Sequence, residues 1–133
     1  SKHVTELVQW IQQQDWYANT TIVLAGDHKS MDNDWFKDIE DSGYDRKVYY
    51  TIVNPAISPA TQNSRTVSTY DLYPTTVASL GITYDSPRLG LGTNLFTDTP
   101  TVVEEIGYKK LNKQTMMHSN YYDKYILYGK SKK

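Results

Sequence analysis

The segment "NTTIVLAGDHKSMD", Asn19–Asp32, joins an apolar run to an adjacent aspartate and histidine. The run itself, Thr20–Ala25, is mostly β-branched and aliphatic, and Gly26 closes it. A run that is apolar on both faces is typical of a central strand in a parallel sheet that helices cover. Asp27 and His28 follow at the carboxyl end of this strand, which is where open parallel sheets bind their ligands.

Apolar residues before this strand have the spacing of a helix with one buried stripe. Val4, Leu7, Val8 and Ile11 stand at positions i, i+3, i+4 and i+7. The sequence therefore predicts a helix over residues 4–14, then a short link and the buried strand. This order is the αβ half of an α/β unit.

The remaining elements are predicted from periodicity and from Gly and Pro positions. They are a long polar loop with one helical turn over 29–47, a second strand over 47–56, a short helix over 72–80, a Gly-rich turn packed on the sheet over 88–96, and a mostly helical segment over 101–128. Asp71 is expected to cap the short helix, with Pro74 in its first turn and Gly81 at its end. A break is expected at Gly107. Residues 1–133 show no internal repeat and no linker.

The composition argues against several classes of protein. The 133 residues carry a formal net charge of −1 with both signs mixed, so a nucleic-acid-binding face is not expected. There is no cysteine, which removes disulfides and thiolate metal sites. No run approaches the roughly 20 apolar residues that span a bilayer. The basic ending "GKSKK", residues 129–133, is interpreted as a solvated tail.

Asp27 and His28 are candidate metal ligands. A carboxylate oxygen and a neutral imidazole suit Mn, Zn, Fe or, less well, Mg. Gly26 allows a sharp turn, so that both side chains can face one point. Spacing alone leaves two interpretations open, half of a metal site or a turn with a capping aspartate. The other histidines, His3 and His118, are expected at the surface.

Substrate-binding residues are not assigned by the sequence. Arg46, Arg65 and Arg88 can each pair with a phosphate, and nothing in the sequence ranks them. Lys29 and Ser30 directly follow the candidate ligands. Either can reach a phosphate or a hydroxyl group, or simply begin a solvated loop.

Four stretches in a fixed order carry a resemblance to a known family. They are "WIQQQDWYANTTIVLAGDHKSMD", "RKVYYTIVNPAI", "TYDLYPTTVASLGI" and "RLGLGTNLF", and together they span roughly residues 4–96. The first resembles the C-terminal part of the alkaline phosphatase and sulfatase superfamily, where a helix, a buried strand and "GDH" occur together. Within that superfamily the chain is most similar to phosphoglycerol transferases, which include the lipoteichoic acid synthases.

The resemblance implies the C-terminal portion of an alkaline phosphatase/sulfatase-like fold, an α/β fold with a mixed or parallel sheet flanked by helices. It implies that Asp27 and His28 bind the catalytic metal, typically Mn²⁺, with Zn²⁺ and Mg²⁺ as alternatives. The family's other protein ligands, an acidic residue and the nucleophilic threonine, lie well upstream of the motif. Residues 1–133 are therefore expected to hold half a metal site and no nucleophile, and to be inactive without the upstream part of the same domain.

The implied reaction is a two-step transfer on the outer side of a bacterial cell membrane. A threonine activated by the metal attacks phosphatidylglycerol, diacylglycerol leaves, and phosphoglycerol passes to a hydroxyl of a cell-envelope polymer or glycan. A sulfatase or a phosphoethanolamine transferase is the alternative within the superfamily. A stand-alone, non-catalytic domain that binds an envelope polymer or a partner is the alternative from another class.

Overall fold

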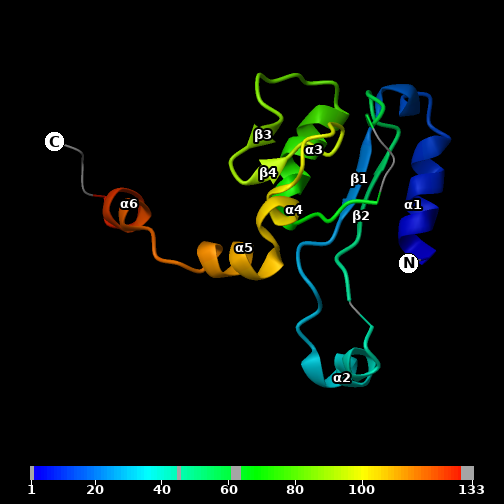
Figure 1. Ribbon diagram of the computed structural model, residues 1–133. Coiled ribbons are helices and arrows are strands. Elements are labelled where there is room, and N and C mark those ends of the chain that lie inside the picture. Colours follow the sequence, from blue (N-terminus) through cyan, green and yellow to red (C-terminus); the bar gives the residue numbers. More distant parts are fainter. Residues whose placement is uncertain (1, 45, 61–63, 130–133) are drawn as a thin grey trace.

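The computed structural model describes residues 2–44, 46–60 and 64–129 and combines helices with two small antiparallel sheets (Figure 1). The elements are α1 Lys2–Gln12, η1 Tyr17–Asn19, β1 Ile22–Ala25, α2 Asn33–Asp41, β2 Tyr50–Val53, η2 Thr69–Asp71, α3 Leu72–Ser79, β3 Arg88–Leu89, β4 Gly92–Thr93, α4 Val102–Ile106, α5 Tyr108–Thr115, α6 Asn120–Tyr122 and the π-helical turn η3 Asp123–Leu127. The chain is therefore of mixed α/β class. Both the predicted first helix and the second strand are present.

The predicted direction and place of the first strand are wrong. β1 pairs antiparallel with β2, with Ile22 opposite Val53 and Ala25 opposite Tyr50. Within the described residues β2 is its only neighbour, so β1 is an edge strand rather than a central one. A continuous apolar run reports that both faces of a strand can be covered, but it does not encode the direction of the partner. Ile22, Val23 and Leu24 are in fact only half-buried.

Asn54 fixes the end of this sheet. Its backbone adopts φ 55°, a left-handed conformation that asparagine tolerates better than most residues. Its side-chain nitrogen donates to the carbonyl oxygens of Tyr17, at 3.0 Å, and Thr20, at 2.9 Å. Two residues on, the Ala56 N–H donates to the Ser79 carbonyl oxygen at 2.7 Å. The exit of β2 is thereby tied both to the approach to β1 and to α3.

The predicted loop after the "GDH" motif contains a full helix. α2 is nine residues long, whereas one helical turn was expected. The negative charge of Asp34 in its first turn interacts favourably with the positive end of the helix dipole. At the other end the Ser42 hydroxyl donates to the Ile39 carbonyl oxygen, and Gly43 follows at φ 82°. The Asp-rich composition masked this helix in the sequence. Figure 1 shows α2 set apart from the other elements.

The predicted short helix forms the centre of the best-packed region. α3 spans Leu72–Ser79 with Pro74 in its first turn, and Gly81, at φ 78°, follows its end as expected. The Gly-rich turn forms the hairpin β3–β4, which packs on α3: the Thr75 hydroxyl donates to the Thr93 carbonyl oxygen at 3.3 Å. Beyond the hairpin, Leu95 and Phe96 line a shallow hollow together with residues of β2, so only this end of the turn reaches the sheet.

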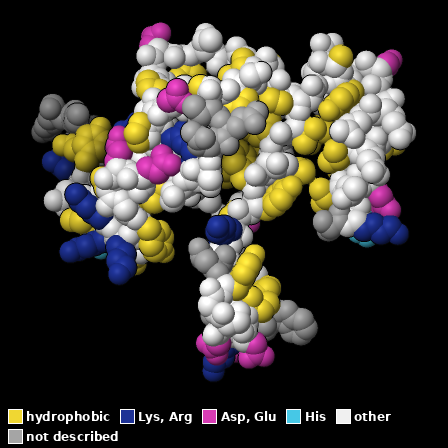
Figure 2. Space-filling view, turned by 45° about the vertical axis from the view of Figure 1, so that its right-hand side comes forward, with side chains coloured by type: hydrophobic (Ala, Val, Ile, Leu, Met, Phe, Trp, Pro, Cys, Tyr) yellow, Lys and Arg dark blue, Asp and Glu magenta, His cyan; other side chains and the backbone are white. Residues whose placement is uncertain are grey.

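The core is small and unusually polar. Its buried hydrophobic residues are Ala78, Val103 and Leu111, and its buried polar residues are Asp71, Thr75, Ser79, Thr93 and Thr101. The chain exposes 10430 Å² to solvent, whereas a compact monomer of this mass exposes about 7,100 Å². Figure 2 shows many hydrophobic side chains at the surface. The described elements thus leave far more surface uncovered than a self-contained domain does.

The C-terminal segment is helical and broken at Gly107, as predicted. α4 ends there, Gly107 has φ 79°, and α5 begins at the next residue. In Figure 1, α5 and α6 lead away from the rest of the molecule. Among the described residues, no helix combines the length and apolar character that crossing a membrane requires.

Candidate functional site

The "GDH" motif lies at the end of β1, as the sequence predicted. β1 ends at Ala25, and the Gly26 N–H still donates to the Tyr49 carbonyl oxygen, at 2.8 Å. The chain then turns, and the Asp27 carboxylate accepts from the backbone N–H of His28 at 2.9 Å. The second carboxylate oxygen of Asp27, Oδ2, lies 3.4 Å from His28 Nε2. The two candidate ligands therefore face one another, and both are largely exposed.

A backbone contact sets the tautomer of His28. Its Nδ1 lies 2.7 Å from the Lys29 carbonyl oxygen. Because a carbonyl oxygen can only accept, Nδ1 carries a proton and donates it, which is the arrangement that second-shell carbonyls give to metal-bound histidines. In a neutral ring the lone pair of Nε2 then faces a carboxylate oxygen. Either a proton on Nε2 or a shared cation satisfies both atoms.

The separation of the two atoms suits a shared ion. Ligand atoms about 2.0–2.2 Å from a tetrahedral ion lie roughly 3.4 Å apart, which is the observed distance between Asp27 Oδ2 and His28 Nε2. Within the described residues, no three His, Cys, Asp or Glu side chains are grouped so as to hold a metal. The donor set therefore fits two positions of a coordination shell. Further ligands would have to come from elsewhere.

The other two histidines lie in different settings. His118 Nδ1 is 3.5 Å from Asp123, and His3 Nδ1 is 3.5 Å from Glu6. Both imidazoles are 93% exposed, as expected of surface residues. His3 and Glu6 belong to α1, whereas His118 lies in the link between α5 and α6 and Asp123 begins η3. They provide internal controls for any property claimed for His28.

Arg46 is the arginine that lies beside the motif. Its guanidinium donates to the Ser30 carbonyl oxygen at 3.3 Å, and its Cζ lies 4.6 Å from the centre of the Phe36 ring. The side chain thus bridges the segment after the motif and α2. Of the three candidate arginines, Arg46 is therefore the one that contacts the segment directly after the motif, whereas Arg65 and Arg88 bond to α4.

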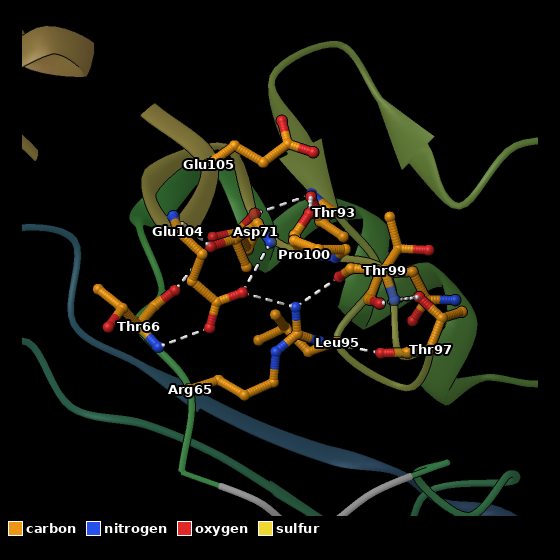
Figure 3. Close-up of polar contacts among 12 residues, drawn as sticks. Arg65, Thr66, Asp71, Thr93, Leu95, Thr97, Thr99, Pro100, Glu104 and Glu105 are labelled. Carbon is orange, nitrogen blue, oxygen red and sulfur yellow. Dashed lines mark hydrogen bonds and ion pairs between the residues drawn. The ribbon is translucent and has the colours of Figure 1, made fainter. Parts of the chain in front are cut away.

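Arg65 is the centre of a network that the sequence did not reveal (Figure 3). It donates to the carbonyl oxygens of Thr97, at 2.9 Å, and Thr99, at 2.5 Å, and pairs with Glu104 at 3.0 Å. The Arg65 guanidinium and backbone N–H groups hold the pKa of Glu104 at about 2, below its usual range. The side chain is 15% exposed and joins the residues after the hairpin to α4, which is a structural role.

Glu104 and Thr101 form a capping box at the start of α4. The Thr101 side chain accepts from the Glu104 N–H, and the Glu104 carboxylate accepts from the Thr101 N–H at 2.8 Å. The same carboxylate accepts from the Thr66 N–H at 3.0 Å. A threonine followed three residues later by glutamate is a recognisable start of a helix. That signal in "TVVE", Thr101–Glu104, could have located this part of the network.

Asp71 has a different role from the predicted one. It stands before α3, but its carboxylate does not cap that helix. Instead one oxygen accepts from the N–H of Ser68, at 2.7 Å, and from its hydroxyl, while the other accepts from the Thr93 N–H at 2.7 Å. Asp71 is fully buried and thus joins η2 to the β3–β4 hairpin. A carboxylate with these partners is structural rather than catalytic.

Arg88 closes the other side of this region. It pairs with Glu105 at 2.5 Å and donates to the Pro100 carbonyl oxygen at 2.6 Å. The hydrogen bond that Arg88 donates to the Glu105 carboxylate raises the pKa of the guanidinium further above its usual value. Arg88, like Arg65, thus pairs with a carboxylate of α4.

A hollow beside α3 contains a different set of side chains from the motif. It has a volume of about 300 Å³ and is lined by residues that follow α3 and the hairpin, including Ile82, Tyr84 and Asn94. Asp85 is its one carboxylate, and it contains no histidine, lysine or arginine. Asp27 and His28 remain the candidate metal ligands. No protein-family model matches the sequence, and neither curated proteins nor solved structures include a significant match.

Proposed function

We propose that this chain is the C-terminal part of a metal-dependent phosphoglycerol transferase of the alkaline phosphatase and sulfatase superfamily. In that role it acts outside the membrane of a bacterium and passes phosphoglycerol from phosphatidylglycerol to an envelope polymer or glycan. The geometry of Asp27 and His28 is the observation that carries the proposal. Their facing lone-pair atoms, 3.4 Å apart at the end of β1, suit a shared divalent ion.

Uncovered surface supports the view that the catalytic domain is larger than this chain. β1 has a free edge within the described residues, and edge strands with unpaired backbone groups are normally covered or paired. The stripe of α1 that the sequence predicted to be buried is also open, with Val4 40% and Leu7 53% exposed. An upstream part of the domain that supplies the nucleophilic threonine and the remaining ligands would cover these surfaces.

The chain's own residues would hold and orient the reactants. Asp27 and His28 would occupy two ligand positions, and the Lys29 carbonyl would keep the imidazole in the coordinating tautomer. Arg46, which contacts the Ser30 carbonyl oxygen after the motif, would bind a phosphoryl oxygen. A divalent ion bound there supplies Lewis acidity for a phosphate ester. The preferred ion is Mn²⁺, with Zn²⁺ and Mg²⁺ as alternatives.

Paramagnetic broadening of the three imidazoles tests the metal site directly. Substoichiometric Mn²⁺ is added to the chain while the ring signals of His3, His28 and His118 are followed by NMR. We expect the His28 signals to broaden first, and Asp27→Asn to abolish the difference. The matched His118→Asn/Asp123→Asn variant, which removes the other exposed pair, should leave the His28 response unchanged.

The result distinguishes a cation shared by Asp27 and His28 from a proton shared by them. Equal broadening of all three rings, or broadening that survives Asp27→Asn, means that the contact between Asp27 and His28 is a proton-mediated ion pair and not a metal site. Affinity in this chain should be weak, because two ligands do not complete a shell of about four.

Transfer by the complete enzyme tests the assignment of function. Asp27→Ala and His28→Ala should each lower the rate by at least about a hundredfold, since each removes a ligand, whereas His118→Ala should not. Release of diacylglycerol from phosphatidylglycerol is the measurement. Turnover of only sulfate esters or phosphatidylethanolamine would place the protein in another branch, and no turnover of any ester would favour a non-catalytic binding domain.

A further inference from the structure

Charge is divided sharply along the chain at α5. Residues 108–133 contain seven lysines and one aspartate, a net charge of +6, whereas residues 1–107 contain seven basic and fourteen acidic residues, a net charge of −7. The overall value of −1 hides this division. Such asymmetry between two parts of one chain indicates a surface made for an anionic partner.

The described part of this basic segment, residues 108–129, is here called the C-terminal arm. Apart from Leu111, all of its large hydrophobic residues are at least partly exposed. The most exposed ones are Tyr108 70%, Met116 77%, Met117 65%, Ile126 61%, Leu127 60% and Tyr128 69%. At the left of Figure 2 lysine and hydrophobic side chains intermingle over the arm. The arm therefore presents positive charge and apolar surface together.

Leu111 sets the orientation of α5. It is 6% exposed and is the buried residue of this helix, which packs beside α4. Lys109 and Lys113 stand two residues before and after it, so at 100° per residue they lie on the opposite face of the helix. The lysines are thus turned away from the rest of the molecule while the arm stays attached to it.

We propose that the C-terminal arm binds an anionic lipid surface. Lysine ammonium groups reach lipid phosphates, and exposed Tyr, Met, Ile and Leu side chains enter the boundary between headgroups and acyl chains. Lysines beside apolar residues suit this interface because their stems bury while their charges stay in water. A polyanionic polymer would satisfy the lysines but would leave Ile126 and Leu127 in water. The combination favours a membrane over a polymer.

Two features of the described arm favour this contact with a membrane; residues 130–133, which complete the ending expected to be a solvated tail, lie outside the described residues. The arm leads away from the remainder of the molecule (Figure 1), so it can lie on a flat surface without a clash from the core. The acidic remainder is repelled by the same surface and would stay in solution above it. The arm would then set the distance and the tilt of the "GDH" motif relative to the bilayer. This inference does not depend on the proposed transferase activity.

Vesicle cosedimentation of the full chain tests the proposal. The vesicles are phosphatidylcholine with or without phosphatidylserine, and phosphatidylglycerol and divalent metals are omitted so that the proposed catalytic site plays no part. We expect binding to the anionic vesicles alone, weakened by salt. Lys109→Gln/Lys110→Gln/Lys113→Gln should lower the partition coefficient roughly a hundredfold, since each lysine near the surface contributes about fivefold.

Matched variants separate a lipid surface from other partners. Lys2→Gln/Lys37→Gln/Lys47→Gln removes as many lysines elsewhere and should change partitioning less than about twofold. Ile126→Ser/Leu127→Ser should lower it about tenfold, whereas Leu80→Ser/Ile82→Ser, at a similarly exposed pair, should not.

Several results would overturn the proposal. They are absence of binding to anionic vesicles, equal losses in the arm and control variants, and wild-type binding by Ile126→Ser/Leu127→Ser together with full competition by polyphosphate. The last result would assign the arm to an anionic polymer. A His28→Ala chain should bind vesicles normally, so a failure of the metal site and a failure of this inference are distinguishable.

Discussion

Side-chain oxygens, rather than aliphatic groups, account for most of the fully buried side chains in this protein. Asp71, Thr93 and Thr101 are fully buried, and each bonds to a partner far along the chain. Paired polar groups of this kind specify one arrangement, because any other arrangement leaves a buried polar group without its hydrogen bond. The stretch "SRTVSTYD", Ser64–Asp71, offers only a capping aspartate as a sequence signal, yet it holds the region together through Arg65 and Asp71.

Glu104 makes the free energy of unfolding depend on pH in the acidic range. Its pKa is about 2 in the folded chain because of Arg65 and the backbone N–H groups, against about 4.3 when unfolded. A depressed pKa stabilises the fold above about pH 4.3, and this contribution is lost as the pH falls from there toward 2. The side chain is 26% exposed, so solvent screening reduces the contribution to roughly 1–2 kcal/mol.

Urea unfolding of wild type and Glu104→Gln at a series of pH values measures this contribution. Glu104→Gln should lower the free energy of unfolding at neutral pH, and its difference from wild type should shrink between about pH 4.3 and 2. Asp98→Asn serves as the control for general titration of carboxylates. A difference that stays constant over this range would show that the Arg65 pair contributes no linked stability.

At the scale of elements, local signals predicted which segments are regular but not how they pair. Each of these signals can be recognised within a short stretch of sequence. They are the apolar spacing in α1, the apolar runs of β1 and β2, Pro74 and Gly81 at the ends of α3, and the break at Gly107. The antiparallel direction of β1 cannot be recognised in this way, since it depends on where β2 arrives in space. Likewise the facing of Asp27 and His28 follows from a local turn, whereas the approach of Arg46 from beyond α2 does not.

Gly92 is the position where the β3–β4 hairpin meets η2 and α3. A Cβ at this residue would overlap the Tyr70 carbonyl oxygen and lie 2.9 Å from Pro74 Cγ. Because the oxygen belongs to the backbone, it cannot move aside without shifting η2. We expect Gly92→Ala to lower the free energy of unfolding by about 3 kcal/mol or more.

Gly90→Ala in the same hairpin is the matched control. Gly90 has φ 61° and no heavy atom within 4 Å of an added Cβ, so its cost is the left-handed backbone alone, about 1 kcal/mol. Thermal unfolding followed by circular dichroism compares the two. If both alanine substitutions lower the midpoint temperature of unfolding equally, close packing of the hairpin on η2 does not contribute to stability.

At the scale of the whole molecule, stability is distributed unevenly. Burial concentrates in η2, α3, β4 and the start of α4, whereas α6 and η3 have no buried residue and α2 lies apart from the other elements (Figure 1). Elements with few buried contacts open at a lower free energy than the rest. Stability is therefore concentrated in one region of the chain. The total exposed area of 10430 Å² is large because the other segments bury little surface.

Hydrogen exchange measures this distribution residue by residue. We expect the slowest amides at Thr93, Ala56 and Leu95, whose N–H groups bond across the best-packed region. Amides of α2 and of α6 should exchange at least about a hundredfold faster, a difference of roughly 3 kcal/mol in opening free energy. Protection of α2 equal to that of α3 would contradict the uneven distribution.

The segment between β1 and β2, residues 26–49, contains α2. Antiparallel pairing of the two strands brings its ends together, and the Gly26 N–H donates to the Tyr49 carbonyl oxygen. Closing such a loop costs entropy that grows only with the logarithm of its length. Insertions, deletions or replacement within this segment beyond the motif therefore change the free energy of folding little. They leave Asp27 and His28 in position at the end of β1. Descendants of this protein can change what surrounds the "GDH" motif, and so what it selects, while inheriting the motif itself unaltered.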